Sequence, residues 1–393
     1  MNHVRKIVKR CVVAVSVFLL FVLKVVSPLV KFQLCIVGFH RYGHLALEPE
    51  VFLAEQRQRL GRDTRFRKHI NIWSFGPRKA QANTYLAEKW KQEVFAPPSW
   101  LVNALHDAGL LIKYLKLPQT KLSIRGQMNA LDTSEPILSF SDKEKRLANK
   151  KLIELGIDLN RPYVCLIVRD GGHYASLGDS ESAGYDLLNF DIETFMPAAN
   201  YLASAGFQVI RMGSGSEKPI SELPVGVIDY AHSSLRSEFL DVFIAATCAF
   251  AVSTQTGPDA VCMAFRRPVL YVDVTRYSQF FFGMKAATWN PVRLVKNGVT
   301  IPFSEILSSD IPWYKDPNEF AQNGITQQKS SPAELLQIVK TYVESFSGSA
   351  ELTDRLSLQV AEQFGERGRQ QFGQISARSI PGLAEILGEW VNN

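Results

Sequence analysis

The turn Phe39-His40-Arg41-Tyr42-Gly43-His44 carries two histidines and follows the short apolar segment Phe32–Val37. Imidazole titrates near neutrality and can take a proton from a hydroxyl group, so His44 is a candidate general base. A capping or packing role for His44 remains the alternative. Neither H-E-x-x-H nor a third ligand accompanies the pair, so we expect no metal site. Glu48 and Asp170 are the alternative bases.

Two arginines end apolar segments further along the chain. Arg169 follows Tyr163–Val168, and Arg211 follows Phe207–Ile210. A guanidinium group matches phosphate oxygens in a bidentate manner, which makes both arginines candidates for binding a diphosphate. Pairing with Asp170 or another carboxylate is the alternative. Gly213 and Ser214 add a backbone amide and a hydroxyl group directly after Arg211.

The turn Ser253-Thr254-Gln255-Thr256-Gly257-Pro258-Asp259 lies between an apolar strand pattern and a helical pattern. Backbone amides at the start of a helix attract anions, so Ser253, Thr256, Gly257 and Pro258 are candidates for a phosphate site. The alternative is an ordinary helix that begins with Thr256 as its N-cap. Asp229, which follows a short strand pattern, is expected to contact the base or the ribose of a nucleotide.

The segments that hold these turns alternate between strand and helix patterns, with strands expected among others at 163–168 and 268–272. Helices are expected among others at 100–117, 141–155, 332–346, 351–371 and 381–391, and residues 275–330 are expected to be rich in loops. This alternation predicts an α/β fold with parallel sheets and right-handed crossovers. We expect two Rossmann-like, doubly wound domains, whose ligands bind at the carboxyl ends of the strands. The expected parts are an N-terminal membrane-associated helix (1–32), a first Rossmann-like domain (33–140), a linker helix (141–159), a second Rossmann-like domain (160–350) and C-terminal helices (351–393).

Several motifs with well-defined chemistry are absent from the sequence. It contains no G-x-x-x-x-G-K-[ST] loop and no G-x-S-x-G elbow, which excludes P-loop NTPases and disfavours α/β-hydrolases. The segment Gly213–Lys218 starts like a dinucleotide fingerprint but has lysine where the last glycine belongs. No Asp-x-Asp occurs, which disfavours a metal clamp on a diphosphate. The five cysteines are scattered, as in a protein from a reducing compartment.

The net charge of +6 is unevenly distributed along the chain. Residues 1–79 contain 15 Lys+Arg and 4 Asp+Glu, whereas the remaining residues carry a net charge of about −5. The basic residues flank the apolar run Cys11–Val30, which Lys24 and Pro28 interrupt, and a second basic cluster follows at positions 57–68. This pattern predicts a membrane surface rather than nucleic acid as partner. A spanning anchor and an in-plane anchor remain open, and a cleaved signal peptide is disfavoured because no cleavage site follows.

Five short motifs together resemble a family of bacterial glycosyltransferases of surface-polysaccharide biosynthesis that are assigned to the GT-B fold. The motifs are Arg41-Tyr42-Gly43-His44-Leu45, Glu48-Pro49-Glu50, Val209-Ile210-Arg211-Met212-Gly213, Ile228-Asp229-Tyr230-Ala231 and Glu238-Phe239-Leu240-Asp241. The resemblance covers residues 35–60 and 160–275. It implies a donor domain for a nucleotide-sugar at 160–350 and an acceptor domain at 33–140, with the acceptor beside Arg41 and Tyr42. It also implies that the C-terminal helices (351–393) return to the first domain.

Two other families share parts of this pattern. Thr256-Gly257-Pro258 with Arg267-Pro268-Val269-Leu270 resembles the heptosyltransferase turn that holds the donor phosphates. In that family a Gly-Asp turn supplies the base, whereas this sequence has Gly43-His44. Val168-Arg169-Asp170 is similar to the arginine motif of α1,6-fucosyltransferases, although only one of that motif's two arginines is present.

The resemblance therefore implies a glycosyltransferase that needs no cofactor or metal and transfers a sugar, with inversion, from a nucleotide-diphosphate sugar to a glycan or lipid-linked acceptor. Arg169, Arg211 and the amides of Thr256 and Gly257 would hold the diphosphate, and His44 would activate the acceptor. The expected location is the cytoplasmic face of the inner membrane. A non-catalytic scaffold for glycan assembly and a nucleotide-sugar epimerase of the same fold are the alternatives.

Overall fold

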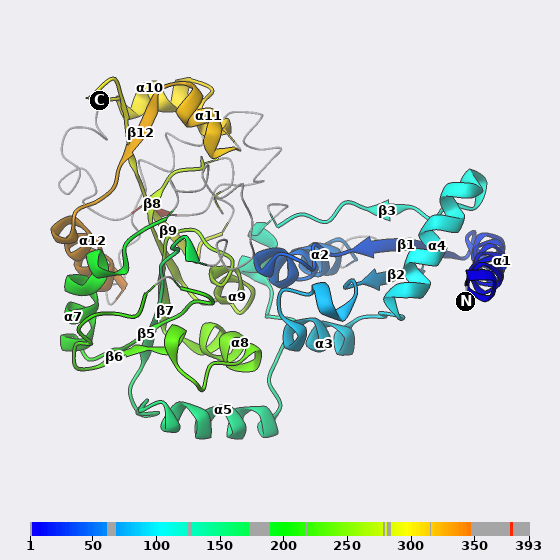
Figure 1. Ribbon diagram of the computed structural model, residues 1–393, viewed down its shortest axis with the longest axis horizontal. Helices are drawn as coiled ribbons and strands as arrows, with labels where there is room; N and C mark the ends of the chain where they lie inside the picture. The colour runs from blue at the N-terminus through cyan, green and yellow to red at the C-terminus, as the bar shows by residue number, and fades with distance from the viewer. Residues whose placement is uncertain are drawn as a thin grey trace. The chain divides into compact units, whose positions relative to one another are not determined.

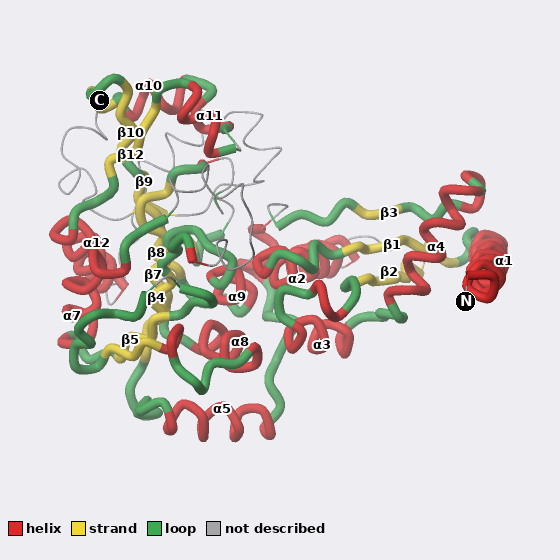
Figure 2. The backbone as a smooth tube through the Cα atoms, viewed as in Figure 1, coloured by secondary structure: helices red, strands yellow, loops and turns green. Residues whose placement is uncertain are grey.

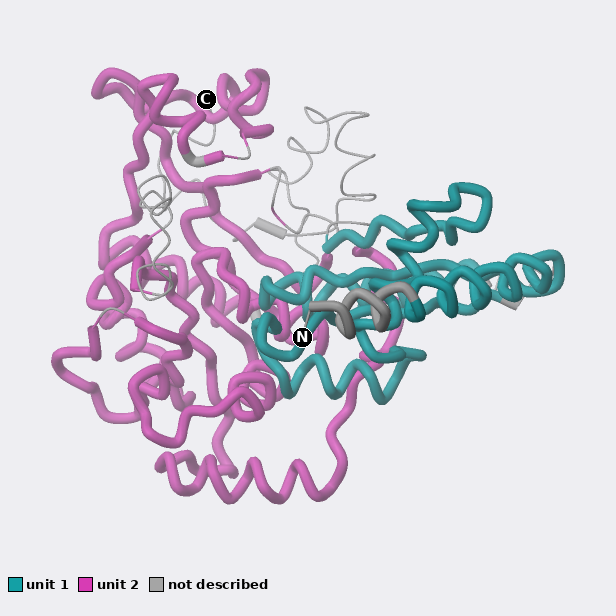
Figure 3. Tube along the Cα trace, turned by 45° about the vertical axis from the view of Figure 1, so that its right-hand side comes forward, with its two compact units in different colours: residues 1–124 teal, residues 125–393 magenta. Residues whose placement is uncertain are grey.

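The computed structural model describes residues 2–60, 68–124, 128–172, 189–216, 218–277, 280, 284–314, 316–346 and 378–379. The chain forms two compact units, residues 1–124 and residues 125–393 (Figure 3). The expected first domain ended at residue 140, whereas residues 125–140 group with unit 2. Arg266 accounts for part of this grouping, because its Nε atom donates hydrogen bonds to the carbonyl oxygens of Leu131 and Ser134, each at 2.9 Å.

Unit 1 contains a parallel sheet with the strand order β2-β1-β3 (Figure 1). Its strands are β1 (Val30–Ile36), β2 (Lys68–Ser74) and β3 (Gln119–Thr120). Its helices are α1 (Asn2–Val26), α2 (Tyr42–Leu60), α3 (Thr84–Glu93) and α4 (Ser99–Leu111), with 3-10 turns η1 (Arg78–Ala80) and η2 (Lys113–Leu115). Helix α4 was expected to continue to Leu117, but the backbone of Ile112 leaves the helical region.

The strand residues of unit 1 alternate between two packed faces, as the pleat of a strand requires. Leu34 and Ile72 belong to a buried cluster with residues of α1, α4 and η2. The indole ring of Trp73, the residue after Ile72 in β2, packs edge-to-face on the ring of Phe52 in α2, with ring centroids 5.6 Å apart. Helices therefore cover both faces of the small sheet.

Helix α1 is part of the core of unit 1. Leu20 is fully buried in the cluster just described, and Val17, Leu19 and Leu23 pack against it. The sequence predicted an appended anchor, whereas in the structure one face of this helix packs on α4 and η2 and belongs to the buried cluster of unit 1.

None of the helices in the described part of the chain combines the length and apolar composition that crossing a bilayer requires.

Unit 2 is built on a fully parallel sheet with the order β13-β9-β8-β7-β4-β5-β6. The strands are β4 (Tyr163–Ile167), β5 (Gln208–Arg211), β6 (Val227–Asp229), β7 (Phe250–Ser253), β8 (Val269–Val274), β9 (Ala287–Pro291) and β13 (Arg378–Ser379). Central strands β4, β7 and β8 are buried along their whole length, as expected when helices cover both faces. The predicted α/β class and doubly wound sheet are confirmed for this unit.

Helices α7 (Met196–Ser204) and α12 (Pro332–Phe346) lie on one side of this sheet, and α8 (Glu238–Thr247) and α9 (Asp259–Ala264) on the other (Figure 2). Helix α5 (Asp142–Glu154) begins with a capping box between Ser141 and Glu144. Gly156, with φ of +84°, follows its end. The local signals for α5 and α12 predicted both helices within one or two residues.

Residues 275–330 were expected to be rich in loops, but they contain β9 and a small antiparallel sheet of order β11-β10-β12. Its strands are β10 (Arg293–Lys296), β11 (Val299–Thr300) and β12 (Ile325–Gln328), and helices α10 (Phe303–Ser308) and α11 (Pro317–Gln322) lie between β11 and β12 in the chain. Asn297 and Gly298 both have positive φ between β10 and β11. An Asn-Gly pair is the preferred two-residue hairpin turn, so the sequence contained this signal.

The remaining 3-10 segments are η3 (Met128–Thr133), η5 (Ile192–Phe195), η6 (Tyr230–His232) and η8 (Ile311–Trp313). The helices expected at 351–371 and 381–391, and the return of the last helix to the first domain, lie outside the described residues. So do Arg62, Arg65 and Arg67 of the second basic cluster.

Candidate active site

The strand order of unit 2 changes direction between β4 and β7. Strands β4, β5 and β6 follow one another towards one edge, and β7, β8 and β9 follow one another towards the other. In open parallel sheets, ligands bind beyond the carboxyl ends of the strands at such a switch point. The residues that follow Ile167 and Ser253, which end β4 and β7, therefore form the first candidate site.

A hydrogen bond joins the two chain segments at the switch point. The backbone N–H of Arg169 donates to Thr254 Oγ1 at 2.9 Å, and the N–H of Thr254 donates to the carbonyl oxygen of Ile167 at 3.2 Å. The half-buried side chain of Arg169 donates from Nε to Asn189 Oδ1 at 3.3 Å. The structure thus holds Arg169 at the place where the sequence predicted it.

Asp259 organises the turn after β7. Its Oδ2 atom accepts hydrogen bonds from Ser253 Oγ at 2.6 Å and from the N–H of Thr256 at 2.8 Å. Burial raises the pKa of Asp259 to about 7, and these two hydrogen bonds oppose part of that effect. Asp259 was not among the predicted site residues, although an acidic side chain in the first turn of a helix often accepts from the backbone N–H three residues before it.

The hydrogen bonds in this turn and the start of α9 differ from those expected for the predicted phosphate site. The amide of Thr256, expected to bind phosphate, donates to Asp259 instead. Helix α9 begins at Asp259 directly after Pro258, so Thr256 is not its N-cap. Gln255 adopts a positive φ of 59°, and the residues from Gln255 to Pro258 are half-buried at the edge of the sheet.

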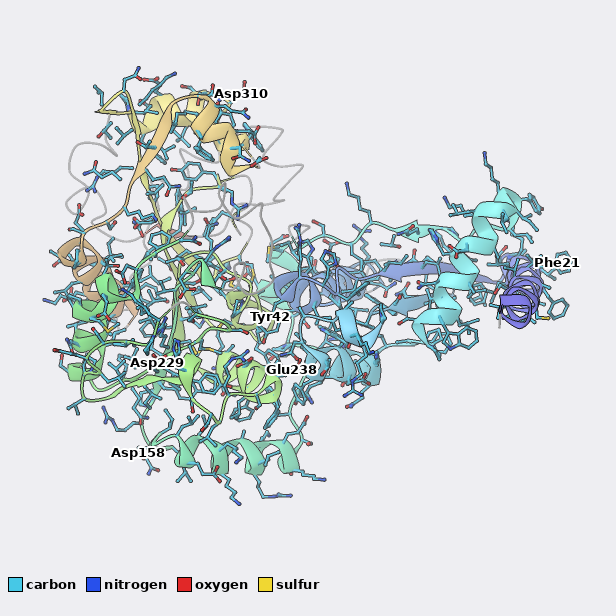
Figure 4. The ribbon with its side chains drawn as sticks, in the orientation of Figure 1. Phe21, Tyr42, Asp158, Asp229, Glu238 and Asp310 are labelled. Atoms are coloured by element: carbon cyan, nitrogen blue, oxygen red, sulfur yellow. The ribbon has the colours of Figure 1, made fainter. Side chains whose placement is uncertain are left out.

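Arg211 lies in a cluster of carboxylates at the carboxyl ends of β4, β5 and β6. Its Nη1 atom lies 3.1 Å from Asp229 Oδ2 and donates to the carbonyl oxygen of Lys218 at 2.9 Å, and its Nη2 atom lies 3.6 Å from Asp170 Oδ2. The residue is 1% exposed. This is the carboxylate pairing that the sequence left open, and Figure 4 labels Asp229 within it. A buried cation of this kind requires such partners.

Asp229 is the centre of this cluster. Besides Arg211, its Oδ2 atom accepts the N–H of Ile220 at 3.0 Å and lies 3.2 Å from Nδ1 of His232. Sequence reasoning missed His232, which follows Asp229 by three residues and is about one-third exposed. The cluster therefore joins three predicted site residues, Asp170, Arg211 and Asp229, to one that was not predicted.

The turn after β5 is fixed by a neighbouring ion pair. Arg236 donates from Nε to the carbonyl oxygen of Gly213 at 2.9 Å, and its Nη2 atom lies 2.9 Å from Asp241 Oδ2. A Cβ atom at Gly213 would lie 2.6 Å from Ser216 Oγ, so a larger residue here would require the Ser216 hydroxyl group to rotate away. Ser214, the next residue, is exposed at the carboxyl edge.

The second candidate site lies in unit 1, where β1 passes into α2. His44 Nδ1 lies 2.8 Å from Glu48 Oε1, and the N–H of Gly38 donates to Glu48 Oε2 at 2.6 Å. His44 and Glu48 are one helical turn apart on the same face of α2. Exposure of the two side chains is 27% for His44 and 8% for Glu48, so the imidazole reaches solvent while the carboxylate is buried.

This arrangement determines which nitrogen of His44 can act as a base. A carboxylate only accepts hydrogen bonds, so Nδ1 carries the proton and Nε2 keeps its lone pair. A Cβ atom at Gly38 would lie 2.9 Å from His44 Cβ, so only glycine leaves the imidazole room. Arg41 is exposed before α2, and Tyr42, labelled in Figure 4, is half-buried as the first residue of the helix.

Within the described residues, no group of three or more histidine, cysteine, aspartate or glutamate side chains is placed to hold a metal ion.

No protein-family model and no curated protein matches the sequence. The chain is similar to three solved glycosyltransferase structures. The ADP-heptose LPS heptosyltransferase II of E. coli is 16% identical, with a TM-score of 0.33, over 68% of this chain and 92% of that chain. A family 9 glycosyl transferase from Veillonella parvula is 11% identical, with a TM-score of 0.34, over 61% and 80%. The iron-containing dodecameric glycosyltransferase TibC of enterotoxigenic E. coli is 12% identical, with a TM-score of 0.33, over 63% and 60%.

Proposed function

We propose that the protein is a glycosyltransferase that moves a sugar from a nucleotide-diphosphate sugar to a hydroxyl group of an acceptor. The observation that carries this proposal is the His44–Glu48 pair at the carboxyl end of β1. It presents a base with a fixed tautomer and a partly exposed Nε2 atom, which suits removal of a proton from an alcohol. The non-catalytic scaffold considered above would not need such a pair.

The donor would bind at the carboxyl edge of the sheet in unit 2. Arg169 lies at the switch point, where its guanidinium group would meet the diphosphate oxygens. Gly257, Pro258, Gly213 and Ser214 border the same edge. We propose that Arg211 acts differently from the other donor residues, because its buried guanidinium group already pairs with Asp170 and Asp229. It would hold the strand ends in place, and Asp229 would act with His232 towards the nucleoside.

The reaction would proceed as a direct displacement. His44 Nε2 takes the proton of the acceptor hydroxyl, the oxygen forms a bond to the anomeric carbon, and the bond to the nucleoside diphosphate breaks with its electrons on the leaving phosphate. The acceptor oxygen attacks from the side opposite the leaving group, so the configuration at the anomeric carbon is inverted. Arg169 would stabilise the leaving charge without a metal ion. Glu48 would stabilise the imidazolium that forms, with Asp170 as the alternative base.

The acceptor side of the proposal rests on unit 1. Arg41 and Tyr42 border the His44 turn and would contact a glycan or lipid-linked acceptor. We propose a role in surface-polysaccharide biosynthesis at the cytoplasmic face of the inner membrane, where nucleotide-sugars are available. The motif resemblance described above and the basic charge of unit 1 support this assignment.

A nucleotide panel tests the donor site. The full chain is melted with GDP, UDP, ADP, CMP and dTDP, each with and without Mg²⁺, because α1 belongs to the core and must be kept. A nucleotide at a hundred times its dissociation constant should stabilise the protein by about 2.7 kcal/mol. We expect one nucleotide to raise the melting temperature without Mg²⁺, and Arg169→Ala to abolish that rise while Arg146→Ala, an exposed arginine on α5, preserves it.

No stabilisation by any nucleotide would contradict the proposal. Binding that depends on Mg²⁺ would contradict its metal independence alone. Nucleotide binding without transfer or donor hydrolysis would favour the scaffold instead.

A further inference from the structure

The outward face of α1 is as apolar as its buried face. Exposed apolar or small side chains recur every three or four residues along the helix, the spacing of one helical stripe. They are Cys11, Ala14, Val15, Phe18, Val22 and Val25, with Phe21 beside them. Phe18 is 66% exposed and Phe21 is 56% exposed, and Figure 4 labels Phe21 on this helix. A helix that is apolar on every side is normally buried on every side.

A second exposed apolar segment adjoins this face. Helix α1 packs against α4 and η2, and Lys24 Nζ lies 5.0 Å from the centre of the Tyr114 ring. At the end of α4 and in η2, Leu110, Leu111, Ile112 and Tyr114 are exposed, with 70% for Leu111 and 77% for Tyr114. We define the apolar platform as the exposed residues Phe18, Phe21, Val22 and Val25 of α1 together with Leu110, Leu111, Ile112 and Tyr114.

Most of the charges next to the platform are positive, although the exposed Asp107 lies one helical turn before Leu111 on α4. Lys24 is the only charged residue between Cys11 and Leu29 of the sequence, and Lys113 and Lys116 are the only ones between Leu110 and Pro118. All three lysines are exposed. Aromatic rings and lysines beside an apolar surface are the residues that anchor a protein at the boundary between lipid headgroups and acyl chains.

The net charge of unit 1 indicates which kind of partner the apolar platform binds. Residues 1–124 contain 20 Lys+Arg and 7 Asp+Glu, a net charge of +13, whereas the rest of the chain has 24 and 31, a net charge of −7. A second copy of the basic unit would be repelled by the first at short range. An anionic lipid surface would attract it, at roughly 1 kcal/mol for each basic residue near the surface.

We propose that the apolar platform inserts into the headgroup region of an anionic bilayer, with α1 lying in the plane of the membrane. The inner face of α1 stays on the core of unit 1 around Leu20, and the outer face enters the lipid. Helix α4 and η2 share the insertion, so the attachment belongs to two helices and not to the N-terminal segment alone. This inference needs no nucleotide and stands independently of the proposed reaction.

Flotation with lipid vesicles tests the proposal on the full chain. We expect binding to vesicles of phosphatidylcholine mixed with phosphatidylglycerol, weaker binding to phosphatidylcholine alone, and a decrease with added salt. The double variant Phe18→Ser/Phe21→Ser should reduce the partition constant by about tenfold or more, because two large apolar side chains no longer enter the lipid. Lys113→Gln and Lys116→Gln should each reduce it about fivefold on anionic vesicles only.

A second double variant tests the contribution of α4 and η2 to lipid binding. Leu111→Ser/Tyr114→Ser should also reduce the partition constant about tenfold, and unchanged binding would overturn the two-helix platform. Val225→Ser/Val299→Ser is the matched control, since these valines of unit 2 are 97% and 70% exposed and lie outside the platform. Melting temperatures of all variants show that the fold is kept.

Two further results would overturn the proposal. One is equal binding of wild type and platform variants to anionic vesicles. The other is a platform variant that converts a dimer to a monomer in sedimentation while vesicle binding stays the same, which would assign the platform to a second copy of the chain.

Discussion

Glu48 uses its two carboxylate oxygens for two different partners, His44 Nδ1 at 2.8 Å and the backbone N–H of Gly38 at 2.6 Å. The side chain that orients the imidazole is therefore itself held by the loop that leaves β1. Because Gly38 also has no room for a Cβ atom beside His44, loop, carboxylate and imidazole form one rigid group.

Replacing Glu48 by glutamine should impair the base without removing it. The amide oxygen of the glutamine can still accept from the N–H of Gly38, but the NH₂ group would face Nδ1 of His44 and favour the tautomer with the proton on Nε2. We expect turnover to fall by about 10²–10⁴-fold, as when an orienting carboxylate of a catalytic triad becomes an amide. The pH–rate profile should change its shape as well as its height, and a uniform loss at every pH would indicate a merely structural role.

Removing the imidazole should slow the reaction and leave the donor site intact. His44→Ala is expected to lower turnover by about 10²–10⁴-fold, the usual contribution of a general base, with nucleotide affinity nearly unchanged. His40→Ala is the matched control, because His40 is an exposed histidine of the same turn. Unchanged turnover in His44→Ala would remove this residue from the mechanism.

Arg211 should affect stability more than nucleotide binding. Arg211→Met leaves Asp229 and Asp170 without their buried cation, and breaking a buried pair in this way typically costs about 3–5 kcal/mol. Urea unfolding measures this loss. Arg211→Met/Asp229→Asn should recover part of it, since one unpaired charge is removed. A stable Arg211→Met protein that no longer binds nucleotide would instead place Arg211 on the diphosphate.

Asp259 should make the stability of unit 2 depend on pH. An aspartate in an unfolded chain titrates near 3.9, whereas burial raises the pKa of Asp259 to about 7 in the folded protein. Between these values the folded chain keeps a proton that the unfolded chain has released. The contribution of Asp259 to the free energy of unfolding therefore falls as pH rises from about 4 to about 7.

Asp259→Asn keeps an oxygen acceptor for Ser253 and Thr256 and removes the titration. Unfolding experiments across this pH range should show that the wild type loses more stability with rising pH than the variant does. Asp310→Asn, at the exposed residue labelled in Figure 4, should behave like the wild type. Equal slopes for wild type and Asp259→Asn would show that the carboxyl group is ionised throughout.

Local sequence signals predicted the frame of the fold well. Strand β8 was predicted from the apolar run that follows Pro268, and α5 from the charged helical pattern that starts at Ser141 and ends before Gly156. These features depend on neighbours in the chain, which the sequence displays directly. Strand β9 was missed because Ala287–Pro291 contains Asn290 and ends in proline, so its local pattern is that of a turn. Pairing with β8 overrides that preference.

The sequence was less informative about the site. It predicted that Arg169 and Arg211 end strands of one sheet, but it could not show that Arg211 is buried against Asp229 while Arg169 reaches Thr254 across the switch point. Such contacts join residues 18 and 85 positions apart in the chain. Pairing of this kind depends on strand register, which a single sequence does not display.

Helix α1 has two apolar faces with two different surroundings. Leu20 belongs to the buried cluster of unit 1, which also contains Leu34 and Ile72, so deleting the N-terminal segment to improve solubility would remove part of this core. In the proposed membrane-bound state, α1 therefore stabilises the fold of unit 1 with one face and contacts lipid with the other. Substitutions that loosen the core and substitutions that weaken lipid contact lie on opposite stripes of α1, and only the first kind should lower the thermal stability.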